Sequence, residues 1–64
     1  MIDNLFDLSG ETAVVTGAGR GIGEGIAKVL ASAGAHVVCA ARRQEEIDRV
    51  AGEINAAGGS AAAL

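Results

Sequence analysis

The sequence predicts an α/β fold, the first β-α-β-α-β portion of a doubly wound parallel sheet. Two apolar runs lack the alternation of a half-exposed strand, and each is followed by a segment whose apolar residues recur at helical spacing. Glycines follow both of these segments, at the positions where helices commonly end. Because strands alternate with helices, we expect parallel pairing through right-handed crossovers.

Residues 1–11 are expected to form a lead-in that Phe6 and Leu8 anchor. The first strand is predicted over residues 11–17 and is apolar on both faces through residues 13–15. A strand with that profile belongs in the middle of a parallel sheet, with helices above and below it. We therefore expect both faces of this strand to be covered.

The first helix is predicted over residues 21–33. Its larger apolar side chains share one face at helical spacing: Ile22, Ile26, Val29, Leu30 and Ala33. Glu24 and Lys28 lie on the other face, which we expect to be exposed, as a favourable i,i+4 pair. Gly34 stands in the position that commonly ends a helix.

A second strand is predicted over residues 36–41 and a second helix over residues 44–57. The buried stripe of this helix is expected to consist of Ile47, Val50, Ala51 and Ile54. Glu45 and Arg49 have the spacing of an i,i+4 ion pair on its exposed side. The glycines at positions 58–59 end the helix.

Residues 60–64 have the composition of the start of a third strand. We therefore expect residues 1–64 to be the N-terminal part of a single doubly wound α/β domain. Two alternatives remain: a complete small protein that Leu64 closes, and a minimised fragment whose first strand is an exposed sheet edge. As an isolated piece, the chain is expected to be marginally folded and prone to associate.

Length, composition and charge exclude several classes of protein. A single cysteine permits no internal disulfide, and the chain has no cysteine and histidine cluster for a metal. The net charge of -3, with no stripe of basic residues, argues against nucleic acid as a partner. No apolar run approaches the roughly 18 residues of a membrane span, and the N-terminus carries acids where a signal peptide has bases. We expect a cytoplasmic protein.

The segment between the first strand and the first helix is rich in glycine, at positions 17, 19, 21 and 23. It does not fit G-x-G-x-x-G, because Ile22 occupies the third glycine position, and no Gly-Lys-Ser/Thr of a P-loop follows. It fits T-G-x-x-x-G-x-G from Thr16 to Gly23. Such a turn presents backbone N–H groups and a helix N-terminus to a phosphate. A mere connecting turn is the alternative, but each glycine at a helix start costs about 1 kcal/mol relative to alanine.

Each residue of this loop has an expected task. Gly17 lets the chain turn sharply off the strand, and Gly21 lets the backbone approach a pyrophosphate. Gly23 removes a side chain where the helix packs on the sheet. Gly19 adds freedom inside the loop, and the Thr16 hydroxyl ties the loop down.

The run T-G-A-G-R-G-I-G at positions 16–23 resembles the coenzyme loop of the short-chain dehydrogenase/reductase family. The segments F-D-L-S-G at 6–10 and G-A-H-V-V at 34–38 are similar to the same family. The resemblance covers essentially the whole chain and about the first quarter of a typical member. It implies a Rossmann-type fold and a nicotinamide dinucleotide as coenzyme.

For the full-length parent, the resemblance implies an oxidoreductase that transfers hydride between this coenzyme and a carbonyl or secondary alcohol. A 3-oxoacyl reductase and a hydroxysteroid-type dehydrogenase are among the open substrate classes. We also expect the parent to be a homo-oligomer. A non-catalytic NADP-binding protein is the alternative.

The end of the second strand, residues 39–43, carries no acid. By the resemblance, Ala41 stands where NAD-preferring members have Asp, and Arg42 stands where NADP-preferring members have Arg. Arg20 matches a second basic position associated with NADP. An arginine fork can bind a 2′-phosphate through two parallel hydrogen bonds. We therefore expect NADP rather than NAD, with Arg43 either sharing the phosphate or facing water.

The residues predicted to bind the coenzyme are Thr16, Gly17, Gly19, Arg20, Gly21, Ile22, Gly23, Arg42 and Arg43. No catalytic residue can be assigned, because the reaction implied by the resemblance uses a Tyr with a Lys four residues later, and this chain contains no tyrosine. The chain alone is therefore predicted to be inactive. Cys39 is expected to be a core residue, and His36 a surface residue.

Overall fold

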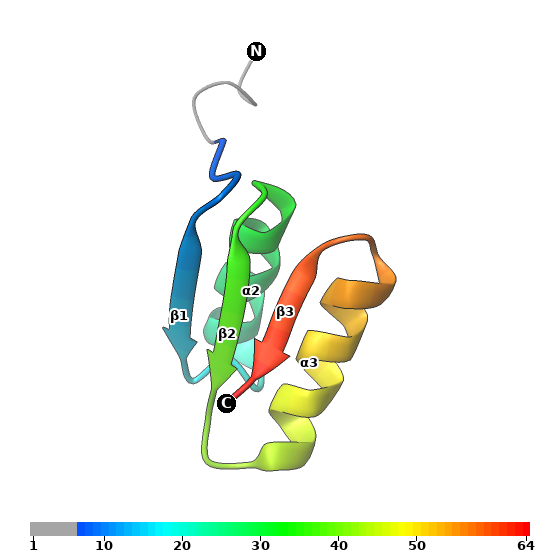
Figure 1. Ribbon diagram of the computed structural model, residues 1–64. Helices are drawn as coiled ribbons and strands as arrows, with labels where there is room; N and C mark the ends of the chain where they lie inside the picture. Colours follow the sequence, from blue (N-terminus) through cyan, green and yellow to red (C-terminus); the bar gives the residue numbers. More distant parts are fainter. Residues whose placement is uncertain (1–6) are drawn as a thin grey trace.

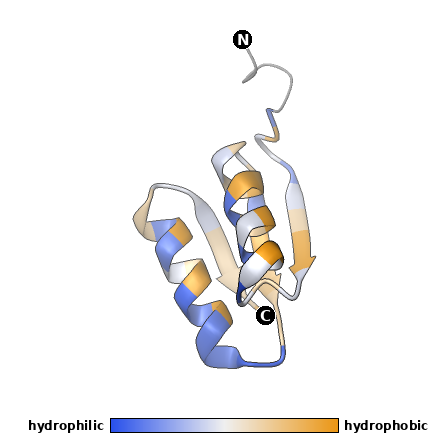
Figure 2. Ribbon diagram, turned by 180° about the vertical axis from the view of Figure 1, so that it is seen from behind, coloured by the Kyte–Doolittle hydropathy of each residue, from blue (hydrophilic) through white to orange (hydrophobic). Residues whose placement is uncertain are grey.

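The computed structural model describes residues 7–64, so the anchoring role predicted for Phe6 lies outside the described residues. The elements in chain order are β1 (Thr12–Thr16), α2 (Gly21–Ser32), β2 (His36–Ala40), α3 (Gln44–Ala56) and β3 (Ser60–Ala63). The strands form a parallel sheet of order β1-β2-β3, and both helices lie on one face of it (Figures 1 and 2). The predicted α/β fold class is confirmed.

Glycines in the left-handed region follow both helices. After α2, Gly34 has φ 107°, and its N–H donates to the Ala31 carbonyl at 3.0 Å. After α3, Gly58 has φ 94°, and the N–H of Gly59 donates to the Ile54 carbonyl at 2.9 Å. These bonds satisfy carbonyl groups that the last helical turn would otherwise leave free. The helices therefore stop where the glycines predict, and the chain returns to the sheet.

The register of the sheet places the ends of the strands level with one another. Thr16 at the end of β1 pairs with Ala40 at the end of β2, and Ala63 of β3 pairs with Cys39. Beyond β1, the N–H of Ala18 donates to the Ala40 carbonyl at 3.2 Å. The glycine loop after β1 and the link after β2 therefore lie side by side at the carboxyl edge of the sheet.

The core lies between the sheet and the two helices. Its buried members are Val15, Ala18, Ala27, Ala31, Ala35, Val37, Cys39, Ile47, Val50 and Ile54. The predicted stripe of α3 is confirmed, since all four of its residues are buried. Burial also raises the pKa of the Cys39 thiol, which keeps this side chain neutral in its core position.

The first helix packs differently from the expected pattern. Ile22 and Val29 are 83% and 68% exposed, whereas Ala27 and Ala31 are buried and, of the predicted stripe, Leu30 is partly buried against the core. The pattern predicted the helix correctly but not the side that faces the sheet.

The expectation that both faces of the first strand are covered is wrong for the described residues. Within residues 7–64, β1 is an edge strand, and its Val14 is 64% exposed. Both helices cross over on one side, so neither of them covers the face that carries Val14 (Figure 2). None of the helices formed by residues 7–64 is long and apolar enough to cross a bilayer.

Candidate functional site

The glycine loop turns sharply between β1 and α2. Gly17 and Gly21 have φ values of 68° and 62°, a region that residues with a Cβ rarely adopt. A Cβ on Gly23 would overlap the carbonyl oxygen of Gly17. The first turn of α2 therefore lies directly on the start of the loop. The contact that excludes a side chain at Gly23 is with loop backbone and not, as expected, with the sheet.

Gly19 is required for a different reason from the one expected. Its φ is not positive, and it is buried. A Cβ at this position would lie 2.7 Å from Glu46 Oε1 and 2.9 Å from Glu46 Cβ. The close approach of α3, and not conformational freedom, therefore explains the glycine.

The loop and the first turn of α2 present a row of free backbone donors. Within residues 7–64, no hydrogen bond engages the N–H groups of residues 19–23. Paired donors lie on either side of this row, because Ala18 donates to Ala40 and Glu24 to Arg20. Arg20 occupies the N-cap position and provides no side-chain cap. Five free donors at a helix N-terminus form a site suited to an anion.

Thr16 does not hold the loop in the way predicted. It is exposed, and its hydroxyl makes no hydrogen bond to any residue in the described part of the chain. The loop is held instead by the bond from Ala18 to Ala40 and by a side chain of α3, described below.

Three arginines belong to segments that meet at this edge of the sheet. Arg20 is in the loop, Arg42 is in the link after β2, and Arg43 is the N-cap residue of α3. The segments are close, since a Cβ on Gly19 would lie 3.5 Å from the Cβ of Ala41. The side chain of Arg20 is 77% exposed, and its only ion pair among residues 7–64 is a long one to Glu46, 3.9 Å. Arg42 and Arg43 are exposed and make no ion pair with the described residues.

Arg49 of α3 contacts the loop, although the sequence did not identify it as a site residue. Its Nη2 donates to the Gly19 carbonyl oxygen at 3.1 Å. The same guanidinium bonds to Glu24 of α2 and to Glu53 of α3. The predicted pair with Glu45 does not form. Both Glu45 and Glu53 lie four residues from Arg49, and only the packing of α3 against α2 decides between them.

Glu24, Lys28, Arg49 and Glu53 form a network of ion pairs between the two helices. Hydrogen bonds from Arg49 and then Lys28 lower the pKa of Glu24 to about 2. Bonds from the same two bases, Lys28 first, lower the pKa of Glu53. The pKa values of Lys28 and Arg49 are raised by the bonds to these carboxylates, Glu24 first in both cases. All four groups therefore carry charge at neutral pH, and their charges sum to zero.

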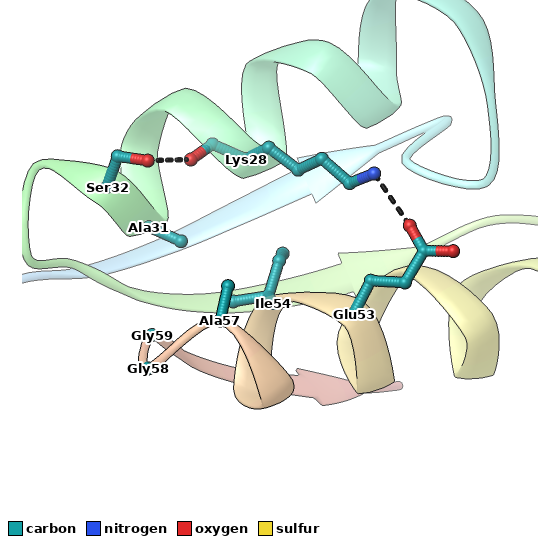
Figure 3. Close-up of a pocket in the computed structure, with 8 residues that line it drawn as sticks. All are labelled: Lys28, Ala31, Ser32, Glu53, Ile54, Ala57, Gly58 and Gly59. Carbon is teal, nitrogen blue, oxygen red and sulfur yellow. Dashed lines mark hydrogen bonds and ion pairs between the residues drawn. The ribbon is translucent and has the colours of Figure 1, made fainter.

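A groove of about 570 Å³ lies near the C-terminal ends of the two helices, away from the glycine loop (Figure 3). It is lined by Lys28, Ala31, Ser32, Glu53, Ile54, Ala57, Gly58 and Gly59. The ion pair between Lys28 and Glu53 lies along it, and the Ser32 hydroxyl donates to the Lys28 carbonyl. Its polar side chains are therefore already paired. No predicted site residue lines this groove, and the described residues contain no cluster of metal ligands.

Comparison with known proteins gives consistent matches. The profile of the short chain dehydrogenase family matches residues 11–64. An uncharacterized oxidoreductase of Mycobacterium tuberculosis is 50% identical over 58 residues, which are 91% of this chain and 22% of that protein.

Solved structures match equally well. The 3-oxoacyl (acyl-carrier-protein) reductase of Agrobacterium tumefaciens, with NADP bound, has a TM-score of 0.92 and 44% identity over all of this chain and 25% of its own. A metagenomic short-chain oxidoreductase in complex with NADP has a TM-score of 0.87 and 55% identity over 91% of this chain and 26% of its own. The chain thus spans about a quarter of the length of these proteins.

Proposed function

The chain belongs to the short chain dehydrogenase family, and from that premise we propose that residues 1–64 form the coenzyme-binding N-terminal segment of an NADP(H)-dependent oxidoreductase. The observation that carries the proposal is the row of free N–H groups at residues 19–23, at the start of α2. These donors and the helix dipole suit the pyrophosphate of a dinucleotide. Gly23 also supports a dinucleotide site. Because it has no side chain, the N-terminus of α2 can lie directly on the loop.

Three arginines support NADP as the preferred coenzyme. Arg20, Arg42 and Arg43 are exposed at the carboxyl edge of the sheet, and the link after β2, residues 41–43, contains no acid. A dinucleotide lying across this edge would bring its adenosine ribose toward the link after β2. A 2′-phosphate there gains charge-assisted hydrogen bonds, and Arg42 is the residue we expect to contribute most.

When bound, the coenzyme would supply the hydride. The residues of this segment hold and orient the coenzyme. The free N–H groups of the loop bind the phosphates of the coenzyme. The exposed side chain of Ile22, at the start of α2, offers the coenzyme an apolar contact. Residues outside this segment would supply the acid and base for a carbonyl or secondary alcohol substrate. A 3-oxoacyl thioester or a hydroxysteroid belongs to the substrate classes we propose to test first.

The proposal is tested by titrating the full-length protein with NADP⁺ and NAD⁺ in a calorimeter. We expect tighter binding of NADP⁺, and Arg42→Asp should weaken it by about 10- to 150-fold while NAD⁺ affinity is retained. Arg43→Asp makes the same charge change one residue further on: a comparable loss of NADP⁺ affinity would show that Arg43 shares the phosphate, and wild-type affinity that Arg43 faces water. Equal affinities for the two coenzymes, or tighter NAD⁺, would refute the NADP assignment.

Activity is tested separately, by following NADPH oxidation with carbonyl substrates (ketones and 3-oxoacyl thioesters) and NADP⁺ reduction with alcohol substrates (hydroxysteroids). Turnover of either class supports the oxidoreductase proposal and narrows the substrate. Tight NADP⁺ binding without turnover of any carbonyl or alcohol would instead favour a non-catalytic NADP-binding protein.

A further inference from the structure

We propose that Arg49 is the positioning residue of the anion site: it binds the Gly19 carbonyl and the Glu24 carboxylate, so that the free N–H groups of the loop stay turned toward the coenzyme's phosphates. This inference rests on the proposed function, because it concerns the preparation of the same site. It adds a residue from α3, which lies 30 positions after Gly19 in the chain.

Arg49 holds the backbone of the glycine loop. Gly19 is buried, and its carbonyl accepts a hydrogen bond from Arg49 Nη2 at 3.1 Å. Among the described residues, no other side chain donates to the backbone of residues 17–20. The C=O and N–H groups of a trans peptide point in opposite directions. A Gly19 carbonyl held toward Arg49 therefore turns the N–H of Arg20 away from α3, and that N–H is one of the free donors.

Arg49 also compensates a negative charge beside the anion site. Glu24 lies in the first turn of α2, where its carboxylate would compete with a bound anion for the helix N-terminus. Arg49 holds both of its oxygens, at 3.1 Å through Nη2 and 3.3 Å through Nη1, and Lys28 Nζ adds a bond of 2.8 Å. The carboxylate is thereby compensated and kept on the side of α3.

Arg49 positions the loop and does not attract the anion by net charge. Arg49 and Lys28 carry two positive charges, and Glu24 and Glu53 carry two negative charges. The network as a whole therefore offers no net positive charge to an anion. Arg49 instead orients the loop, because its planar guanidinium can donate hydrogen bonds to a carbonyl and to two carboxylates at the same time.

The experiment measures the dissociation constants of NADP⁺ and NAD⁺ for the full-length protein and its variants, together with each variant's melting temperature. Arg49→Met should weaken both coenzymes about tenfold, the size expected for a lost charge-assisted bond, and should leave their ratio unchanged. Adding Glu24→Gln to Arg49→Met should recover part of the loss, because the uncompensated carboxylate is removed.

Glu53→Gln is the matched control. It removes the negative charge of the group that accepts from Arg49 Nη1 at 3.1 Å and from Lys28 Nζ at 2.7 Å, but it changes neither Gly19 nor Glu24. It should lower the melting temperature about as much as Arg49→Met and leave both dissociation constants within twofold. Equal losses of affinity in the two variants would mean that Arg49 acts through stability alone, and would overturn the inference.

The remaining outcomes are also decisive. A wild-type protein that binds NADP⁺, with an Arg49→Met variant that binds it equally well, overturns the inference and leaves the proposed function intact. A wild-type protein that binds neither dinucleotide overturns both. If Arg49→Met does not fold, Arg49→Lys decides: it keeps the charge but not the fork, so a several-fold weaker affinity at an unchanged melting temperature supports positioning, and wild-type affinity refutes it.

Discussion

The two helices cover the same face of the sheet but turn different side chains toward it. α3 packs through large residues, and Ile47, Val50 and Ile54 are all buried. α2 packs through Ala27, Ala31 and the partly buried Leu30, while Ile22 and Val29 remain exposed within residues 7–64. The difference indicates that α3 is placed by its apolar stripe, whereas α2 is placed by the glycine loop that leads into it.

The largest expected effect contrasts one isoleucine from each helix. Ile47→Ala removes a side chain that is only 1% exposed, so it should lower the free energy of unfolding by about 2–5 kcal/mol. Ile22→Ala removes an exposed side chain and should change stability by less than about 0.5 kcal/mol. Urea unfolding of the full-length protein measures both. An equal loss in the free energy of unfolding for the two variants would contradict this difference between the helices, because Ile22 would then be as well packed as Ile47.

The second effect concerns the approach of α2 to the loop. Gly23→Ala places a methyl group against the Gly17 carbonyl, so we expect a loss of about 1–3 kcal/mol in stability and weaker coenzyme binding. Gly25→Ala, two residues along the same helix, is the control. Nothing lies within 4 Å of its added Cβ, so it should stabilise the protein by about 0.5–1 kcal/mol. If both variants had the same effect, close packing on the loop would not be what places α2.

The smallest effect is the pH dependence of the network that joins the helices. The pKa of Glu24 is lowered from 4.5 to about 2 by its bonds to Arg49 and Lys28, so the unfolded chain takes up this proton first as the pH falls. The stabilisation from Glu24 is therefore complete above pH 4.5 and is lost as the pH falls toward 2. The melting temperature should therefore fall between pH 6 and pH 2. This fall should be smaller in Glu24→Gln, which has no carboxylate to protonate at this position. Because the network is at the surface, salt should weaken it as well.

Much of the candidate site could be predicted from local sequence. The glycines at 17, 21 and 23 follow from the needs of a tight turn and a close approach, and these needs show in the spacing itself. Arg49 could not be found in this way. It reaches the loop only because α3 packs beside α2, and no local pattern relates it to Gly19, 30 residues earlier. The role of Gly19 was misjudged for the same reason, since its neighbour Glu46 comes from α3.

Local sequence patterns specify the order of the elements, their parallel arrangement and the position of the glycine loop at a helix start. Those features depend on apolar periodicity and turn residues, which act over a few neighbouring positions. Only the tertiary structure decided which side of α2 faces the sheet, which carboxylate Arg49 binds and which face of β1 is covered. Those choices depend on how segments far apart in the chain fit against one another, and a pattern within one segment cannot specify them.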